Sequence, residues 1–329
     1  MKKRGKGLGC AWYGTGYGNG FPDVSSAFVE IHDDGSATVL TGAVDVGQGS
    51  SSIYAQIAAE ELGLQSQDIC VITADTDVTP DSGTSAATRQ TYNTGNAVLK
   101  AVRQAKACLL EYAAREFSCP NPEAIELKGG YIEVKGDLSR RVPLAEMVFK
   151  ARLNGRRMIS AESSTAFSTP LDMENGQGAP YWPYSFGCQM AEVEVDTETG
   201  IVRVLKVVAV HDVGKALNPT QVEGQIAGGV AQGIGFALLE ELEINNGKIK
   251  NPAFSSYLIP TAVDVPDIEA FVVEEAEETG PFGAKGLGEP AMLPTIAAVI
   301  NAIDDAVGVR ITSLPATPEK VLQALAEKL

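Results

Sequence analysis

The chain has 329 residues, enough for one large domain or two packed lobes, and its 44% hydrophobic content is typical of a globular protein. The formal net charge of -16 is spread along the chain, which argues against nucleic-acid binding because phosphate partners need clustered Lys and Arg. The basic cluster at 2–6 precedes glycine-rich sequence instead of an apolar core, so it is no signal peptide, and no apolar run approaches the roughly 20 residues that cross a bilayer. We therefore expect a cytoplasmic protein with no membrane partner, built from two lobes at 1–162 and 163–329.

Cysteine and histidine usage argues against a metal cluster bound by side chains of this chain. The two histidines cannot form a His-rich site, and most widely spaced cysteines are buried or idle thiols. None of the five cysteines belongs to a Cys-x-x-Cys pair, so an iron–sulfur cluster is not expected on this chain. The five are Cys10, Cys70, Cys108, Cys119 and Cys188.

The first lobe alternates strand and helix patterns. Residues 5–20 are crowded with glycine and aromatic side chains, a composition typical of irregular backbone pressed against something else. Alternating apolar segments at 27–31 and 38–40, joined by Asp33-Asp34-Gly35, predict a hairpin. The later elements of this lobe are predicted as helices at 50–62, 96–116 and 144–151 and strands at 69–73 and 132–134.

The second lobe repeats this mixture. Residues 163–183 are rich in Ser, Thr, Gly and Pro and are predicted to cross between the lobes. Because strands and helices interleave without a regular βαβ period, we expect the α+β class, with a small mixed sheet and packed helices in each lobe. The predicted elements are a hairpin at 191–195 and 201–210 and helices at 221–241, 296–307 and 318–326.

The two predicted hairpins are similar to one another. Segment 28–47 runs strand, Asp-rich turn, strand and then Asp45-Val46-Gly47, while segment 193–214 runs strand, acidic turn, strand and then Asp212-Val213-Gly214. A helix containing Ala and Gly follows each of them. Both chance similarity of hairpins and an internal duplication explain this pattern, and a duplication would let both helix-starting turns face one crevice.

Two motifs of the first lobe suit an anionic or heteroaromatic ligand. Gly47-Gln48-Gly49 lies between a strand and a helix, where free backbone N–H groups favour a phosphate, although most Gly-x-Gly turns only reverse the chain. The polar run 75–94 is long for a connection, and its part 82–91 offers small hydrogen-bonding side chains and one Arg. A solvated Ser/Thr loop is the plainer interpretation of the same residues.

Two motifs of the second lobe are rich in glycine. The helix at 224–233 contains glycines that each cost about 1 kcal/mol relative to Ala, which implies close backbone packing against another helix or a cofactor. In the segment 283–290 three glycines surround the carboxylate of Glu289, as expected if bulky side chains must be kept from a reacting centre. The alternative is that Glu289 is an acid at a helix start, stabilised by the helix dipole.

Taken together and in this order, these motifs resemble the molybdenum hydroxylases, the family of xanthine, aldehyde, carbon monoxide and nicotinate enzymes. No single motif is specific for this family, but the five motifs in the same order are. Together they cover nearly the whole chain. The resemblance is to the C-terminal half of the molybdopterin-binding subunit. Because a start Met stands where the longer subunits continue from an N-terminal half, the chain is most similar to the split, medium subunit of nicotinate dehydrogenases. The matching features are Gly47-Gln48-Gly49, the Ser/Ala/Arg loop, Asp212-Val213-Gly214 with Asn218-Pro219, the glycine-rich helix ending in Gln232, and Gly283-x-x-Gly286-x-Gly288-Glu289.

The resemblance implies roles for individual residues. Glu289 matches the catalytic base, and Gln232 is implied to hydrogen-bond the cofactor near a metal that the pterin dithiolene holds, without protein ligands. Tyr13 lies near a region that borders the substrate in relatives, and its hydroxyl either binds a substrate carboxylate or packs in an interface. The residues implied to contact molybdopterin and its nucleotide extension are Gly47, Gln48, Gly49, Ser85, Ala86, Ala87, Thr88, Arg89, Gln90, Thr91, Lys285 and Gly286.

The cofactor implied by the resemblance is molybdenum-molybdopterin in its cytosine dinucleotide form, with a terminal sulfido or selenido ligand. FAD and 2Fe–2S clusters are expected on separate subunits, beside a larger molybdopterin subunit, because this chain has neither a flavin motif nor cluster cysteines. The implied reaction is hydroxylation of a small N-heteroaromatic substrate, nicotinate to 6-hydroxynicotinate, by an enzyme active only in the complex. The alternatives are a subunit of a purine, xanthine, aldehyde or CO dehydrogenase, a non-catalytic scaffold that holds the cofactor, and a stand-alone nucleotide-binding protein.

Overall fold

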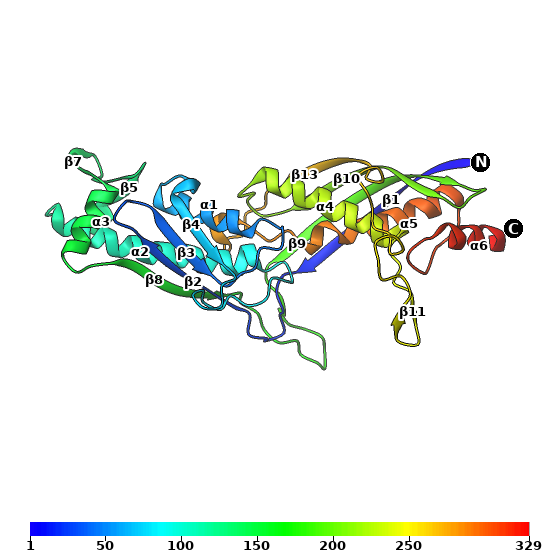
Figure 1. The fold of residues 1–329 in the computed structure, drawn as a ribbon, viewed down its shortest axis with the longest axis horizontal. Coiled ribbons are helices and arrows are strands. Elements are labelled where there is room, and N and C mark those ends of the chain that lie inside the picture. Colours follow the sequence, from blue (N-terminus) through cyan, green and yellow to red (C-terminus); the bar gives the residue numbers. More distant parts are fainter. Residues whose placement is uncertain (329) are drawn as a thin grey trace. The chain divides into compact units, whose positions relative to one another are not determined.

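Figure 1 shows the fold in a computed structural model, which describes residues 1–328. The chain forms two units, and each is assembled from separate stretches of the sequence. We call them unit 1 and unit 2. Unit 1 contains 1–14, 184–275 and the chain from Leu287 onward, and unit 2 contains 15–183 and 276–286.

These boundaries differ from the predicted division after residue 162. Strand β1 (Lys2–Gly14) pairs antiparallel with β9 (Tyr184–Asp196) along its whole length, so the start of the chain belongs to the same unit as its later part. The predicted crossing segment ends where the chain passes from unit 2 into β9 of unit 1.

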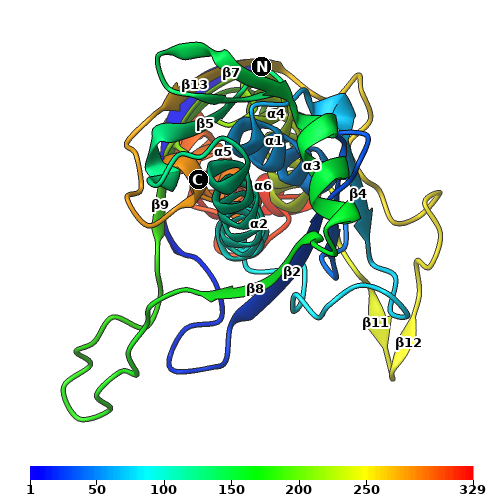
Figure 2. The same ribbon diagram turned by 90° about the vertical axis from the view of Figure 1, so that its left-hand side faces the viewer.

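Unit 2 is built on a four-stranded sheet in the order β4-β3-β2-β8. Strands β2 and β3 are antiparallel, β4 is parallel to β3, and β8 pairs antiparallel with β2. Every second residue of β2 and β3 is buried, as a half-buried strand requires, so the predicted hairpin is confirmed. Helix α2 lies along β2 and β8 (Figure 2). The elements are β2 (Val24–Ile31), β3 (Ala37–Thr41), β4 (Ile69–Thr73), β8 (Met158–Thr165), α1 (Ser50–Leu62) and α2 (Gly95–Glu116).

Helices α1 and α2 form where the sequence spacing predicts them. Helix α1 begins after Gly49, at φ 82°, and ends at Gly63, at φ 61°, both in the left-handed region that glycine adopts at low cost. Helix α2 continues from a π-helical turn at Gln90–Thr94 and buries an apolar stripe around Leu109. The predicted bounds of both helices agree with the structure to within one residue.

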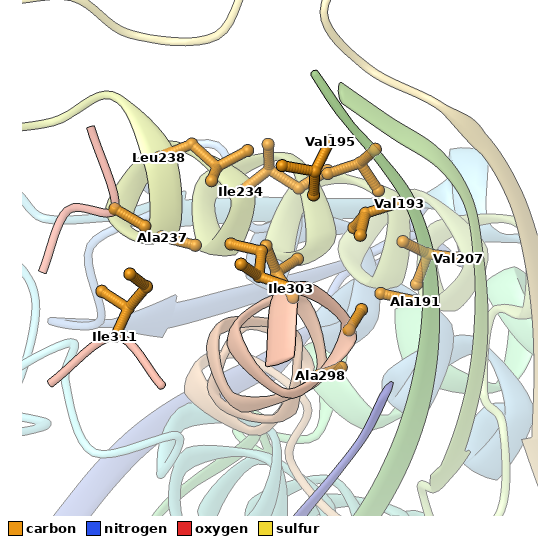
Figure 3. Close-up of a cluster of buried hydrophobic side chains, with 14 of the residues drawn as sticks. Ala191, Val193, Val195, Val207, Ile234, Ala237, Leu238, Ala298, Ile303 and Ile311 are labelled. Carbon is orange, nitrogen blue, oxygen red and sulfur yellow. The ribbon is translucent and has the colours of Figure 1, made fainter. Parts of the chain in front are cut away.

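Unit 1 is built on a second four-stranded sheet, in the order β1-β9-β10-β13. Strand β10 is antiparallel to β9, and β13 is parallel to β10. Helices α4 and α5 pack against one another, and their apolar side chains join those of β9 and β10 in one core, where Val193, Ile234 and Ile303 meet (Figure 3). The further elements are β10 (Val202–Asp212), β13 (Asp267–Val273), α4 (Pro219–Leu238), α5 (Leu293–Val307) and α6 (Pro318–Lys328).

The two sheets share one topology. In unit 2 an antiparallel pair, β2 and β3, is followed by α1, a parallel strand β4 and the long helix α2. In unit 1 the pair β9 and β10 is followed by α4, the parallel strand β13 and α5. Strand β8 and strand β1 take the same edge position, antiparallel to β2 and to β9. This agreement favours an internal duplication over chance similarity of two hairpins.

The remaining elements are additions to the two main sheets. A three-stranded sheet and the helix α3 belong to unit 2, and a short ribbon belongs to unit 1. With small mixed sheets and packed helices in each unit, the predicted α+β class is confirmed. These elements are β5 (Ile125–Lys128), β6 (Tyr131–Val134), β7 (Asp137–Pro143), α3 (Leu144–Leu153), β11 (Ile244–Asn245) and β12 (Lys248–Ile249).

The prediction of irregular backbone at 5–20 is wrong over β1, which is a continuous strand of 13 residues. Its glycines alternate along one face, where they touch α5. A Cβ atom would lie 2.3 Å from a backbone atom of α5 at Gly5, 2.2 Å at Gly7 and 2.0 Å at Gly9. The glycines therefore permit close packing of a strand on a helix, which is the close contact that their number predicted.

One helical stretch, Glu289–Val307, is 19 residues long and apolar enough to cross a membrane by length and composition alone. The sequence predicted no apolar run of that length. Half of the segment is buried inside unit 1, where it packs against β1, β9 and α4, as a core helix does.

Candidate functional site

The turn Gly47-Gln48-Gly49 of unit 2 is organised by the carboxylate of Asp45. Oδ1 accepts hydrogen bonds from the backbone N–H groups of Gly47 (3.0 Å) and Gly49 (3.2 Å), and Oδ2 accepts one from Ser51 (3.1 Å). Burial raises the pKa of Asp45, but these N–H donors outweigh it and hold the pKa below its usual value. Three of the N–H groups expected to be free for a phosphate are thus already used by Asp45.

The side chain of Gln48 folds back onto the same turn. Its Oε1 accepts a hydrogen bond from the backbone N–H of Val46 (2.6 Å), and its Nε2 donates to the Val44 carbonyl and to Ser50 Oγ, both at 3.0 Å. The amide therefore fixes the loop that precedes α1. A ligand contact by Gln48 requires this amide to share or exchange these bonds.

Asp212 repeats part of this arrangement in unit 1. Its Oδ1 accepts a hydrogen bond from the N–H of Gly214 at 3.0 Å, as Asp45 Oδ1 does from Gly47. Both Asp-Val-Gly segments therefore close the same kind of turn after the second strand of a hairpin, in agreement with the shared topology of the two units.

The Ser/Ala/Arg loop lies beside the Gly47-Gln48-Gly49 turn. Ser85 Oγ donates to the carbonyl of Val44 at 2.7 Å and accepts from its N–H at 3.0 Å. Gln90 Nε2 donates to Ser85 Oγ at 3.2 Å, and Gln90 Oε1 accepts from Tyr54 of α1. The structure thus brings together two sequence motifs that are about forty residues apart, since Val44 and Ser85 differ by 41 positions.

Arg89 is a structural residue of this loop. Its side chain is 1% exposed, and its Nε donates to the carboxylate of Asp23. The four remaining guanidinium N–H groups have acceptors in Ser25 and in the backbone carbonyls of Ser82, Thr84 and Val24. With all five donors used, the guanidinium has none left for a ligand, so the predicted cofactor contact of Arg89 would have to come from its backbone.

Strain and close packing mark the middle of the loop. Ala87 and Thr88 have positive φ angles of 52° and 58°, which is costly for residues with a Cβ atom and common at ligand sites. A Cβ atom on Gly286 would lie 2.0 Å from the carbonyl oxygen of Thr88, so the Lys285-Gly286 segment packs on this loop because residue 286 is glycine. Two distant sequence motifs therefore meet inside unit 2.

The glycine-rich helix α4 of unit 1 has two kinds of glycine. At Gly229 a Cβ atom would lie 2.7 Å from Ala291 Cβ, and at Gly233 it would lie 2.5 Å from Thr295 Cβ. At Gly224 and Gly228 it would meet nothing within 4 Å. These two glycines and Gln232 recur at intervals of four residues, so they form one exposed face of the helix. We call this face the open face of α4.

Glu289 begins the short turn Glu289–Ala291 that leads into α5, and its side chain is half-buried. A buried glutamine, which was not predicted from the sequence, hydrogen-bonds to this turn. Gln189 Nε2 donates to the carbonyl of Ala291 at 2.7 Å, and its Oε1 accepts a hydrogen bond from Thr295 Oγ1. Gln189 therefore fixes the backbone two residues after Glu289.

His211 completes this buried network. Gln189 Nε2 lies 2.9 Å from His211 Nε2, and since an amide nitrogen only donates, the imidazole accepts there and is neutral. Burial lowers the pKa of His211 to about 4. Gly187 makes room for the ring, because a Cβ atom there would lie 2.6 Å from His211 Nδ1. The predicted strand began at residue 191, whereas β9 begins at Tyr184, so local spacing indicated neither Gln189 nor its partners.

The other expected site residue is Tyr13, which lies in β1, opposite Ser185 of β9, and is half-buried. Within residues 1–328 no group of three or more His, Cys, Asp or Glu side chains is placed to hold a metal ion.

The model of one family, the molybdopterin cofactor-binding domain, matches residues 1–266. The chain belongs to this family. It is 33% identical over 329 residues to the xanthine dehydrogenase molybdenum-binding subunit of Escherichia coli O157:H7, covering 98% of this chain and 42% of that protein. It is 35% identical over 327 residues to the 6-hydroxypseudooxynicotine dehydrogenase complex subunit gamma of Paenarthrobacter nicotinovorans, covering 97% of this chain and 39% of that one.

Among solved structures, quinoline 2-oxidoreductase from Pseudomonas putida 86 has the same fold as this molybdopterin-binding chain. The TM-score is 0.87 at 30% identity, over 99% of this chain and 42% of that chain. The chain thus spans about two fifths of the length of the relatives that it matches. The resemblance to molybdenum hydroxylases drawn from the sequence is confirmed at the level of the family.

One face of α4 offers open space for a cofactor. On the open face of α4 the backbone is exposed at Gly224 and Gly228, where a Cβ atom would meet nothing within 4 Å, so a ligand has room to approach the helix. Gln232, at the end of that face, is exposed. In the first turn of the same helix, buried Gln221 Oε1 has no hydrogen-bond partner among the described residues.

Proposed function

We propose that this chain is the cofactor-binding and base-bearing part of a molybdenum hydroxylase that acts on an N-heteroaromatic acid, nicotinate being the first candidate. The observation that carries the proposal is in unit 1. Glu289 stands on a turn fixed by Gln189, and α4, which packs on that turn through Gly229, presents an open face ending in Gln232. A carboxylate on a fixed turn, which packs against a helix with an exposed glycine face, suits a base next to a bound cofactor.

Each residue has a proposed role. Gln232 would hold the cofactor with its amide, and Gly224 and Gly228 would let the cofactor approach the helix backbone. In unit 2, the pterin and its nucleotide would be bound by Gly47, Gln48, Gly49, the loop residues Ser85 to Thr91, Lys285 and Gly286. Arg89 would contribute only its backbone to this contact. When bound, the molybdenum cofactor supplies the two-electron oxidation. The Glu289 carboxylate would accept the proton that is lost as oxygen is delivered to the ring carbon.

We propose the cytosine dinucleotide form of the cofactor with a terminal sulfido or selenido ligand. The proposed partners are a larger molybdopterin subunit, an FAD subunit and a 2Fe–2S subunit in the cytoplasm. One relative supports them, because it is named as a subunit of a dehydrogenase complex. Tyr13 is proposed to bind the substrate carboxylate. The names of relatives keep xanthine- and aldehyde-type substrates as alternatives.

The test is Glu289→Gln in the native complex. The amide keeps the size of the side chain but accepts no proton at neutral pH, so we expect a loss of turnover of about 100-fold or more with molybdenum content unchanged. Glu243→Gln, an exposed acid of the same unit, is the matched control and should keep full activity.

The readouts separate the alternatives. Retained molybdenum and wild-type turnover in Glu289→Gln would overturn the role of Glu289 as base and favour a non-catalytic scaffold. A native complex without molybdenum or pterin would overturn the function as a whole. Comparing nicotinate with xanthine and an aldehyde as substrates of the wild-type complex decides the substrate class, independently of the role of Glu289.

A further inference from the structure

Two of the five cysteines meet on the sheet of unit 1. Cys10 of β1 and Cys188 of β9 are direct partners in the antiparallel register, and their Sγ atoms are 3.5 Å apart. Directly opposed residues of antiparallel strands have Cα atoms about 4.5–5.5 Å apart, inside the range of about 4.4–6.8 Å that a disulfide bridges. Closing the bond therefore needs side-chain rotation and little backbone movement.

The pair is open to solvent. Cys10 is exposed and Cys188 is partly exposed, on the face of the sheet opposite to α5. Burial, and the neighbouring thiol of Cys10, raise the pKa of Cys188. Cys10 is thus the more accessible thiol and is expected to react first with a reagent. Cys188 is then the second thiol, which reacts with Cys10. The other three cysteines, Cys70, Cys108 and Cys119, belong to unit 2.

A cross-link at this place would covalently join an edge strand to its neighbour. Strand β1 is at the edge of its sheet, and its inward face near α5 carries the glycines Gly5, Gly7 and Gly9 instead of apolar side chains. Its first half has cross-strand ion pairs, such as Lys2 with Glu194 at 2.7 Å. The half that contains Cys10 has no ion pair to β9 among the described residues.

We propose that Cys10 and Cys188 form a reversible, redox-sensitive thiol pair that takes small-molecule disulfides such as oxidised glutathione as oxidant. The Cys10 thiolate attacks one sulfur of the oxidant and releases one thiol, leaving a mixed disulfide on Cys10. The Cys188 thiol then loses its proton and attacks Cys10 Sγ, which forms the intramolecular bond and releases the second thiol. Two protein thiols are oxidised and one disulfide is reduced to two thiols. The closed pair ties β1 to β9.

The test uses the full chain, reduced and then exposed to oxidised glutathione. We expect two of the five thiols to disappear on titration, a mass decrease of about 2 Da and a single linked peptide pair containing Cys10 and Cys188. Hydrogen exchange of the β1 amides should slow, and dithiothreitol should restore all of these values. Cys10→Ser should abolish the bond, and Cys70→Ser, an exposed cysteine of unit 2, is the matched control that should leave it intact.

Each outcome of these experiments either supports or overturns the proposed thiol pair. Glutathione that stays attached to Cys10 or Cys188, or bonds formed equally with the other cysteines, would overturn the proposal. If Cys10→Ser does not fold, the wild-type chain is titrated with phenylarsine oxide, which bridges two neighbouring thiols. Binding of one equivalent that protects Cys10 and Cys188 from alkylation supports the pair, and absence of binding overturns it. None of these readouts depends on the cofactor or on turnover.

Discussion

Adjacent glycines of α4 should respond differently to the same added methyl group. At Gly228 a Cβ atom meets nothing within 4 Å, whereas at Gly229 it lies 2.7 Å from Ala291 Cβ and 2.8 Å from the Ala291 carbonyl carbon. Contacts that short require the turn carrying Glu289 to move. Gly228→Ala and Gly229→Ala are therefore a matched pair that differs only in what the new methyl group touches.

The magnitudes follow from the geometry. Both substitutions gain the same helix propensity, about 1 kcal/mol relative to Gly, and Gly229→Ala alone carries an overpacking cost of about 1–3 kcal/mol. The propensity gain cancels in the comparison. Gly228→Ala should therefore raise the free energy of unfolding by about 1 kcal/mol, and Gly229→Ala should lie below it by about 1–3 kcal/mol.

Urea unfolding of the two variants beside the wild-type chain measures this difference as a change in midpoint at constant slope. A second readout tests the open face of α4. Gly228→Ala places a methyl group where the cofactor is proposed to lie, so the native complex carrying it should contain less molybdenum although the chain itself is more stable. Equal stability of the two variants would refute the packing argument, and unchanged molybdenum content in Gly228→Ala would refute the cofactor contact at this face.

Two further predictions concern buried polar groups. His211 has a pKa of about 4 in the folded chain against an ordinary value of 6.5, so the unfolded chain binds more protons between these values and stability should fall as the pH drops from 6.5 to 4, by at most about 3 kcal/mol. Urea unfolding at pH 7 and pH 4.5 measures this loss, and a His211→Asn variant with an equally steep pH dependence would contradict the assignment. Replacing Arg89 by Met leaves the carboxylate of Asp23 buried without its partner, so the free energy of unfolding should decrease by about 3–5 kcal/mol. An Arg89→Met, Asp23→Asn double variant that recovers much of this loss in thermal unfolding supports the pairing, and no recovery speaks against it.

The sequence alone determined the elements whose patterns are local. Ser50–Leu62 has helical spacing with Gly63 at its end, and β4 is a short apolar run, so their limits follow from neighbouring residues. The order of the glycine motifs was enough to indicate the family. It also drew attention to Glu289, whose role as base remains a proposal.

Only the tertiary structure decided which residues meet over long distances. Strand β1 looked irregular because its glycines have no side chains to show a period, yet they are what α5 requires. Arg89 looked like a ligand-binding residue, and its five donors turned out to be used inside unit 2. Gln189 and Cys188 gave no signal, because a hydrogen bond or a thiol contact across a hundred residues or more leaves no trace in local spacing. Local patterns fix backbone conformation, whereas partners are chosen by the packing of whole elements.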